Sequence, residues 1–266
     1  MKLVYHSFYD SFPREYGETP GEVHMYADQF VMKCRPEPNS VALLVEPRSI
    51  IPDTYRWVEQ NWEKYIHVYT FDGQLLEAIP NSKLMLYGQI TAEFPDAPKT
   101  KNISMACSGK EFCEGHKNRQ RIARELKGRI DVFGTFDGGA YASDEEIYSG
   151  YRFTVAMENY KEGYYFTEKI CNCFASKIVP IYWGTNRISK FFDTDGIIKA
   201  ATPDDVPKLV DMVLQDPEGE YNKRLDAVER NYKYVQDYRS FARLFLKTYG
   251  EDLERIAEIN ERHRND

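Results

Sequence analysis

The chain has 266 residues, of which 42% are hydrophobic and 14% aromatic, a composition that predicts one large or two small folded domains and excludes a disordered chain. Its net charge of −7 argues against nucleic acid and anionic lipid as partners, so an anionic ligand would need a local cluster of positive charge. Because no run of about 18 apolar residues occurs, no transmembrane segment is expected. Five cysteines without metal-ligand spacing favour a reducing, cytoplasmic compartment.

Alternating strand and helix patterns fill the first third of the chain. Short apolar runs predict strands at residues 2–7, 40–45, 67–71 and 83–87. Helices are expected at residues 22–32, 52–65 and 73–79. This alternation predicts a mostly parallel, Rossmann-like sheet. The polar, proline-bearing residues 91–101 lack periodicity and are predicted to link this part to the next.

Glu46 is the candidate catalytic residue of this first part. It follows a predicted buried strand and precedes Pro47, so its carboxylate is expected at the carboxyl edge of the sheet. A general base would suit that position, facing a cleft between domains. The alternative is an ordinary surface glutamate at a strand end. The nearby Asp53 and Asp72 are each expected to cap a helix or turn the chain.

A second set of strand and helix patterns follows the predicted linker. Strands are expected at residues 102–107, 130–134, 151–157, 178–183 and 197–198. A basic helix should end at Gly128, another should begin near Thr167, and the chain from residue 203 onward is predicted to be helical. Residues 193–196 contain a D-x-D pattern, which could hold a metal in another architecture but here predicts a turn, and no metal site is expected.

Residues 151–184 carry the pattern with the most chemical information. Strand, loop, helix and strand in this order form a βαβ unit, whose helix begins at the carboxyl edge of the sheet. The unpaired N–H groups of the helix start and the charge of Lys169 favour a phosphate, while Glu168 suits the two hydroxyls of a ribose. Together they indicate a nucleoside diphosphate. The alternative is that Glu168 and Lys169 are ordinary charges of a first helical turn.

Three motifs in this segment resemble the donor-binding signature of the α-1,3-fucosyltransferases, glycosyltransferase family 10. They are E-N at residues 158–159, Y-F-T-E-K at residues 165–169 and P-I-Y-W-G at residues 180–184. Two positions depart from the family pattern. Tyr160 stands where the family has a small residue, and Tyr164 stands where an acidic residue is common. These departures leave open a donor sugar other than fucose.

The resemblance implies donor-binding roles for residues outside the helix start. The family has an arginine seven residues before the apolar position that closes this basic helix. In this chain that position is Leu126, so the resemblance implies that Arg119 holds the diphosphate. A solvated helix charge is the alternative for Arg119. Asn159 and Tyr165 would contact the phosphates or the sugar, and Ser108 would mark the same cleft.

The resemblance also implies a domain arrangement and a base. We expect an α/β fold with two Rossmann-like domains facing a central cleft, of the GT-B type. Residues 1–93 would form the acceptor and base domain, residues 98–240 the donor domain, and residues 241–266 a helix that braces the first domain. The segment V-E-P-R-S at residues 45–49 resembles the E-S-P-like segment of the family, which implies that Glu46 deprotonates the acceptor hydroxyl.

The predicted reaction is an inverting transfer of L-fucose from GDP-fucose to a hydroxyl of an oligosaccharide or glycoconjugate acceptor, with an α-1,3-type linkage. Fixed positive charge would stabilise the departing diphosphate in place of a metal, so no cofactor is expected. Two alternatives are kept. One has the same fold and a different GDP-sugar donor, and the other is a non-catalytic protein that binds a glycan or a nucleotide without turnover.

Overall fold

The computed structural model describes residues 1–8 and 11–265 and divides the chain into two compact units. Unit 1 consists of Met1–Tyr87 and Ser240–Asp266, and unit 2 consists of Gly88–Arg239. Each unit has its own five-stranded sheet, and every pair of neighbouring strands is parallel. Helices alternate with the strands along the chain, which confirms the expected α/β class and its Rossmann-like sheets.

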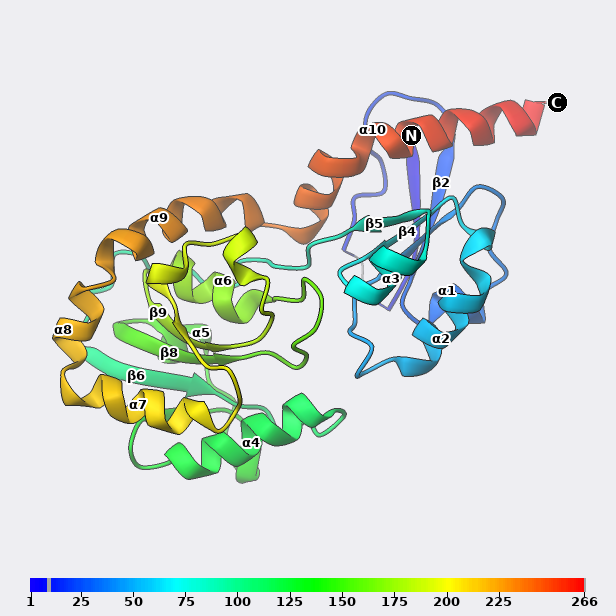
Figure 1. The fold of residues 1–266 in the computed structure, drawn as a ribbon. Helices are drawn as coiled ribbons and strands as arrows, with labels where there is room; N and C mark the ends of the chain where they lie inside the picture. Colours follow the sequence, from blue (N-terminus) through cyan, green and yellow to red (C-terminus); the bar gives the residue numbers. More distant parts are fainter. Residues whose placement is uncertain (9–10, 266) are drawn as a thin grey trace. The chain divides into compact units, whose positions relative to one another are not determined.

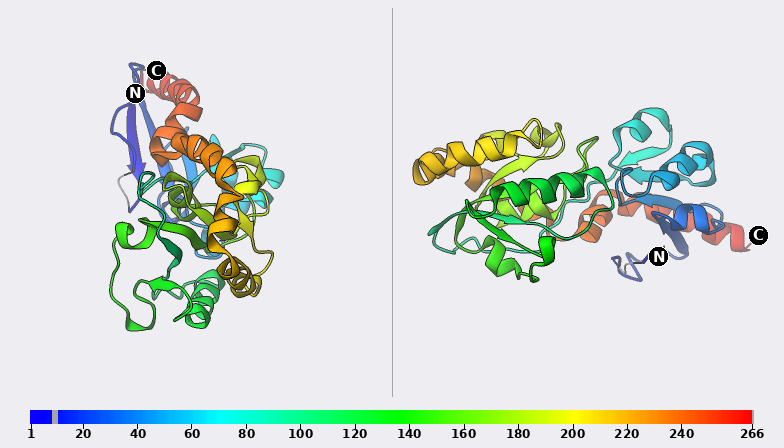
Figure 2. Two further views of the ribbon diagram at one scale, coloured as in Figure 1. Left: turned by 90° about the vertical axis from the view of Figure 1, so that its left-hand side faces the viewer. Right: turned by 90° about the horizontal axis from the view of Figure 1, so that it is seen from below.

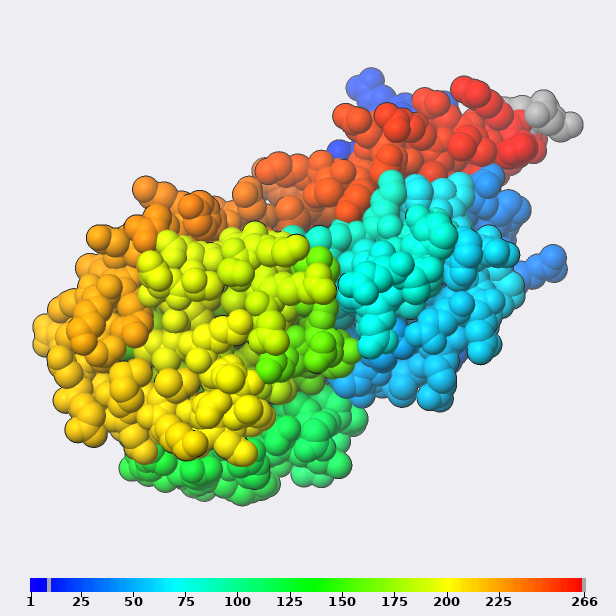
Figure 3. Space-filling view, viewed as in Figure 1, coloured from blue at the N-terminus to red at the C-terminus, as the bar shows by residue number. Residues whose placement is uncertain are grey.

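The sheet of unit 1 has the strand order β1-β2-β3-β4-β5, the same as the order along the chain. Its strands are β1 (Lys2–His6), β2 (Glu22–Ala27), β3 (Val41–Leu44), β4 (His67–Thr70) and β5 (Ser82–Leu84). The helices of the unit are α1 (Phe30–Lys33), α2 (Pro52–Asn61), α3 (Gly73–Ala78) and the C-terminal α10 (Phe241–Asn265). Helix α3 lies at the surface of the unit, in cyan in Figure 3.

Side chains of alternate sheet positions enter two separate cores in unit 1. On one face, strand residues such as Tyr26 and Leu44 pack against apolar residues of α1, α2 and α3. On the other face, strand residues such as Met25 and Leu43 pack against Phe245 and its neighbours in α10, which lies along the sheet in Figure 1. Both ends of the chain therefore build this unit. None of the described helices, α10 included, combines the length and the apolar composition that a membrane span requires.

The helix predicted for residues 22–32 is wrong over its first half. Residues Glu22–Ala27 form strand β2, and only Phe30–Lys33 are helical. Val23 and Met25 are fully buried on either side of the partly buried His24, which is the alternation that a strand requires, and the last two residues, Tyr26 and Ala27, are buried on opposite faces of the sheet. Parallel pairing with β1 on one side and β3 on the other satisfies its backbone, and this tertiary context outweighs the local helical pattern.

The sheet of unit 2 has the strand order β10-β9-β8-β6-β7. Its strands are β6 (Lys101–Ala106), β7 (Asp131–Phe133), β8 (Tyr151–Met157), β9 (Val179–Trp183) and β10 (Ile198–Lys199). Its helices are α4 (Glu114–Leu126), α5 (Asp144–Tyr148), α6 (Glu168–Ala175), α7 (Asp205–Gln215), α8 (Pro217–Asn222) and α9 (Leu225–Val235). Helix α4 lies across one side of this sheet when the unit is seen from below in Figure 2.

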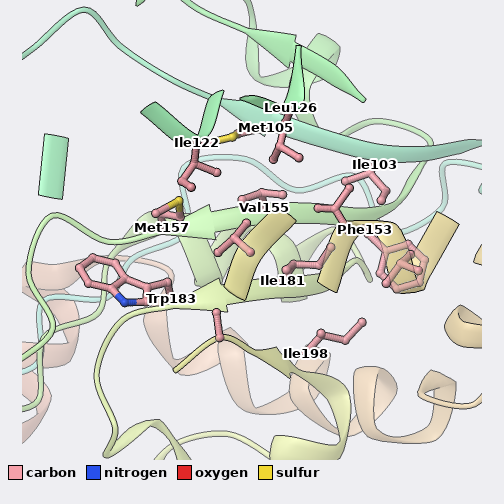
Figure 4. Close-up of a cluster of buried hydrophobic side chains, with 14 of the residues drawn as sticks. Ile103, Met105, Ile122, Leu126, Phe153, Val155, Met157, Ile181, Trp183 and Ile198 are labelled. Carbon is pink, nitrogen blue, oxygen red and sulfur yellow. The ribbon is translucent and has the colours of Figure 1, made fainter. Parts of the chain in front are cut away.

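The main core of unit 2 lies between its sheet and the two helices α4 and α7. Figure 4 shows Ile122 and Leu126 of α4 directed at strand side chains that include Val155 and Ile181. Helix α6 packs on β8 and β9 and contacts α9, and all its residues from Ile170 to Ala175 are buried. With apolar cover on both faces, polar side chains gather where the strands end.

The segment predicted to be a linker packs within unit 2. The backbone N–H groups of Thr91 and Ala92 donate to the Oδ1 of Asn172 in α6, at 2.9 and 3.1 Å, and the N–H of Phe94 donates to the Oγ of Ser176 at 3.1 Å. The chain instead passes from unit 1 to unit 2 after Tyr87. The acceptors that hold this segment lie about 80 residues further along the chain, so no local pattern reveals them.

Candidate functional site

A cavity of about 350 Å³ opens in unit 2 at the carboxyl ends of β6, β7 and β8. Five of the six residues predicted to bind the donor line it: Ser108, Arg119, Asn159, Glu168 and Lys169. Ligands of parallel α/β sheets bind at this edge because the strand ends leave polar groups and helix starts there. The structure thus brings together side chains that are up to 61 positions apart in the sequence.

Thr167 fixes the start of α6 at the cavity. Its Oγ1 accepts the backbone N–H of Lys169 at 3.4 Å as the N-cap of the helix. Thr167 is itself held by the fully buried Glu158, whose carboxylate accepts the Thr167 N–H at 2.9 Å and the Thr167 hydroxyl at 2.8 Å. The E-N motif and the Y-x-T-E-K motif are therefore joined through the Glu158 side chain.

Lys169 brings a full positive charge to this helix start. Its Nζ donates to Thr167 Oγ1 at 2.9 Å and to Glu168 Oε1 at 3.1 Å, and it lies 3.4 Å from Glu158 Oε2. Burial lowers the pKa of Lys169, but the carboxylates of Glu168 and Glu158 outweigh burial and the net shift is upward. Lys169 is therefore a fixed cation at neutral pH, with the helix dipole adding to its attraction for an anion.

Glu168 and Glu158 lie in different environments although both face Lys169. Burial raises the pKa of Glu158, whose carboxylate is inside the protein. Burial also acts to raise the pKa of Glu168, but Lys169 reverses the shift and the pKa is lowered. The Glu168 side chain is 37% exposed and lines the cavity, so an ionised carboxylate is available there to accept hydroxyl hydrogen bonds.

Arg119 reaches the cavity from α4 and is only 6% exposed. Its Nη1 donates to the carbonyl of Met157 at the end of β8, at 3.1 Å. The Nε of Arg119 is buried and has no hydrogen-bond partner among the described residues. A buried guanidinium group normally has its donors paired, so the free Nε indicates a place for a bound anion. Leu126 is buried at the end of the same helix, while Arg121 points away and pairs with Asp204.

Asn159 lines the cavity beside this arginine, and its buried Oδ1 also lacks a partner within the described part of the chain. The backbone of Asn159 is approached closely by Gly115 of α4. A Cβ added at Gly115 would lie 2.2 Å from the Asn159 carbonyl oxygen, which only glycine permits. This contact sets the distance between the start of α4 and the loop that follows β8.

The cavity lining also contains residues that were not predicted from the sequence, among them the polar side chains of Lys110, His116, Tyr141 and Asp144. Burial lowers the pKa of His116 to about 4, helped by the positive charges of Arg119, Lys169 and Lys110, so the imidazole is neutral at physiological pH. Its Nδ1 lies 3.2 Å from the Sγ of Cys113. A basic loop before the helix was the only sequence signal for Lys110 and His116.

Tyr165, the sixth predicted donor residue, is not brought to the cavity. It is 3% exposed and its ring packs edge-on against Tyr160 at a centroid distance of 6.2 Å. Tyr164 also lies outside the cavity lining, and its hydroxyl accepts a hydrogen bond from Arg187 at 2.6 Å. The aromatic rings of this loop pack into the unit because they have apolar neighbours there. Motif spacing in the sequence does not reveal these neighbours, because the tertiary structure sets them.

Glu46 lies in unit 1, just past the carboxyl end of β3 as predicted. Its backbone N–H and that of Val45 donate to the Oδ1 of Asp28, at 2.9 and 2.8 Å, and its carbonyl accepts the hydroxyl of Tyr55 at 3.0 Å. Burial raises the pKa of Asp28 to about 6 against the lowering effect of these two N–H groups, and the nearby Glu46 charge adds to the rise. Asp28 was missed because its strand was predicted to be a helix.

Three carboxylates that the sequence placed at caps or turns have structural roles. Asp72 caps α3, and Asp53 pairs with Arg56 in the first turn of α2. Asp193 of the D-x-D pattern caps a short 3-10 turn, Thr194–Gly196, and pairs with Arg230 at 2.7 Å. The placements of Asp72 and Asp193 confirm the predicted cap and turn, whereas Asp53 lies within the first turn of α2 and does not cap it.

Comparison with protein families and characterised sequences gives two matches. The family model described as glycosyltransferase family 10 (fucosyltransferase) C-term matches residues 97–245, which include the whole cavity except Thr91. A protein of Acanthamoeba polyphaga mimivirus that is named as a fucosyltransferase is 32% identical over 90 residues. That match covers 34% of this chain and 14% of the viral protein, so most of the viral protein has no counterpart in the matched segment.

Solved glycosyltransferase structures are similar to this chain in fold. A crystal structure of an α1,3-fucosyltransferase with GDP has a TM-score of 0.57 at 13% identity, over 96% of this chain and 90% of that chain. One with GDP-fucose has a TM-score of 0.53 at 14% identity, over 87% and 77%. The structure of TarM has a TM-score of 0.58 at 8% identity, over 86% and 54%. This likeness confirms the GT-B type of fold that the sequence led us to expect.

Proposed function

This chain belongs to glycosyltransferase family 10, the fucosyltransferases, and we propose that it transfers L-fucose from GDP-fucose to a hydroxyl of a glycan acceptor. One observation is the main support for the proposed donor site. A helix start with the fixed cation Lys169 shares a cavity with Arg119 Nε and Asn159 Oδ1, a buried donor and a buried acceptor that lack partners among the described residues. A diphosphate oxygen and a hydroxyl would satisfy these two atoms.

The proposed roles follow from charge and exposure. Arg119 and Lys169 hold the diphosphate and offset the negative charge that grows as GDP leaves. Glu168 accepts the ribose hydroxyls, and Ser108 and Asn159 contact the phosphates or the sugar. Tyr165 supports the loop from within the unit rather than touching the donor, because it is buried away from the cavity.

Glu46 is the proposed general base. It would remove the proton of the attacking acceptor hydroxyl in an in-line displacement that inverts the anomeric carbon, with an α-1,3-type linkage. The fixed position of its backbone on Asp28 and Tyr55 supports this role, because a base must be held in place to act in a defined geometry. Glu46→Gln should lower transfer by roughly 10²–10⁴-fold and leave GDP affinity unchanged.

The test is transfer by the purified chain from GDP-fucose to a panel of oligosaccharides, with products identified by mass and linkage analysis. A product one deoxyhexose heavier supports the proposal, and methylation analysis decides the linkage. Parallel reactions use GDP-mannose in place of GDP-fucose. Faster transfer of mannose than of fucose would show that the donor is another GDP-sugar. GDP binding without transfer to any acceptor would instead favour a protein that binds nucleotides without turnover.

A further inference from the structure

The cavity of unit 2 contains a second carboxylate that the proposed reaction does not use. Asp144 lines it together with Glu168, although the two are 24 positions apart in the chain. It is the first residue of α5, directly after the N-cap Ser143. The capping box of this short helix is made by Ser143 and Glu146, whose Oε2 accepts the Ser143 N–H at 2.8 Å. Capping therefore leaves the Asp144 carboxylate available, and it forms no hydrogen bond or ion pair within residues 1–8 and 11–265.

Charges of both signs line the cavity. Its cations are Arg119, Lys169 and Lys110, and all three act on His116, which lines the cavity with them. Glu168 is paired with Lys169 at 3.1 Å, and Glu168 is the charged neighbour that, after burial, raises the pKa of Asp144. Glu168 and Asp144 are the two carboxylates among the described residues of the cavity lining, and only Glu168 is paired with one of its cations.

This set of charged groups matches the parts of a nucleoside diphosphate. The cations suit the diphosphate, and Glu168 suits the ribose that follows it. The base is the remaining part of such a ligand, and Asp144 is the remaining carboxylate of the described cavity lining. Apolar side chains for the faces of a base come from the same helix, because the buried Ile147 and Tyr148 line the cavity, and Tyr141 adds an exposed ring before the helix.

A carboxylate can only accept hydrogen bonds, and this limits which base it selects. Guanine presents two adjacent donors, the ring N1–H and the exocyclic amino group, to a single carboxylate. Adenine and cytosine place a ring nitrogen acceptor beside their amino group, and uracil places carbonyl oxygens on both sides of its one N–H. Each of these would set an acceptor against the carboxylate, so the two groups would repel each other and a hydrogen bond would be lost.

We propose that Asp144 is the specificity-determining residue that selects guanine, by accepting hydrogen bonds from N1–H and the 2-amino group of the base. The inference rests on the proposed nucleotide site and extends it from the diphosphate and ribose to the base. Glu145, the next residue of α5, does not line the cavity and has the same charge, so it is a matched control.

The test is isothermal titration of the chain with GDP and with inosine diphosphate, which lacks the 2-amino group. The unmodified chain should bind GDP about tenfold more tightly than inosine diphosphate. Asp144→Asn should weaken GDP binding by about tenfold and reduce the preference over inosine diphosphate to about twofold, while Glu145→Gln keeps both values. Thermal unfolding of each variant checks its folding, and Asp144→Ser repeats the test if Asp144→Asn does not fold.

The outcomes separate this inference from the proposed function. If Asp144→Asn keeps the full preference for GDP, the assignment of Asp144 is wrong while the donor site stands. An equal loss in Glu145→Gln would show a general charge effect and would also overturn it. Binding of UDP or ADP in preference to GDP by the unmodified chain would contradict both the guanine assignment and the proposed GDP-fucose donor.

Discussion

The Nζ of Lys169 lies 3.4 Å from Oε2 of Glu158, a carboxylate that is fully buried and lies outside the cavity lining. The same carboxylate accepts the hydroxyl and the N–H of Thr167, so a single buried group positions both the N-cap of α6 and the cation beside it. The cation that we propose to bind a diphosphate is thus oriented by a residue that need not touch the ligand.

Replacement of Glu158 by glutamine should destabilise the chain. The amide NH₂ would stand where Oε2 now accepts the Thr167 hydroxyl and faces Lys169, so a donor would meet donors in a buried place. The free energy of unfolding should fall by roughly 1–3 kcal/mol in urea titration. Glu162→Gln, an exposed change in the same loop, is the control and should be neutral. Equal stability of the two variants would contradict the positioning role.

Arg119→Lys should weaken the binding of a nucleoside diphosphate and leave the affinity for the nucleoside unchanged. Lysine keeps the charge but loses the planar fork and its free Nε. The affinity for GDP should fall by roughly 10–100-fold, and the affinity for guanosine should stay the same, in parallel calorimetric titrations. Arg121→Lys on the same helix should change neither affinity, because Arg121 pairs with Asp204 outside the cavity. A similar loss for guanosine would argue against the assigned contact.

Chelation of divalent metals should leave fucosyl transfer unchanged. Lys110, Arg119 and Lys169 supply fixed positive charge to the cavity, which can offset the charge of the departing diphosphate. The measurement compares initial rates of GDP release with and without EDTA, after dialysis against the chelator. A rate that falls on chelation and returns with added Mg²⁺ or Mn²⁺ would show that these cations do not suffice.

Stability should depend on the titration of Asp28. Its pKa is about 6 in the fold and about 3.9 in an unfolded chain, so the folded state binds more protons between these values. Stability from this group is therefore present at pH 4 and falls as the pH rises through 6, by up to roughly 3 kcal/mol. Asp28→Asn should remove this fall, and asparagine tolerates the φ of +50° at this position. Parallel pH profiles of the two proteins would contradict the assignment.

Alanine at Gly115 should destabilise unit 2 and weaken GDP binding together. Alanine normally favours a helix by about 1 kcal/mol over glycine. Here its Cβ would meet the Asn159 backbone at 2.2 Å, which forces α4 away from the cavity loop at a cost of roughly 1–3 kcal/mol or more. Lys117→Ala, at an exposed position of the same helix, should change both quantities little. A Gly115→Ala protein with normal GDP affinity would show that the close contact does not position the site.

Much of the cavity lining at the start of α6 could be predicted because its motif is contiguous. A strand, an N-cap threonine and the Glu168–Lys169 pair follow each other within residues 151–169, so local pattern alone indicates a helix start with phosphate chemistry. The family resemblance selected Arg119, and helical periodicity added only that Arg119 and Arg121 lie on different sides of the helix. The alternation of elements likewise predicted both parallel sheets.

The sequence by itself thus determined the α/β class, the family motif and the cation at the start of α6. Only the tertiary structure decided that Asp144 and His116 share the cavity with that cation, that Tyr165 does not, and that Asp28 ends a strand beside Glu46. The physical reason is that periodicity acts over a few residues. Which side chains meet at one edge of a sheet depends on which strands are neighbours. The strand order in turn depends on how the two faces of the sheet are buried against helices that are distant in the sequence.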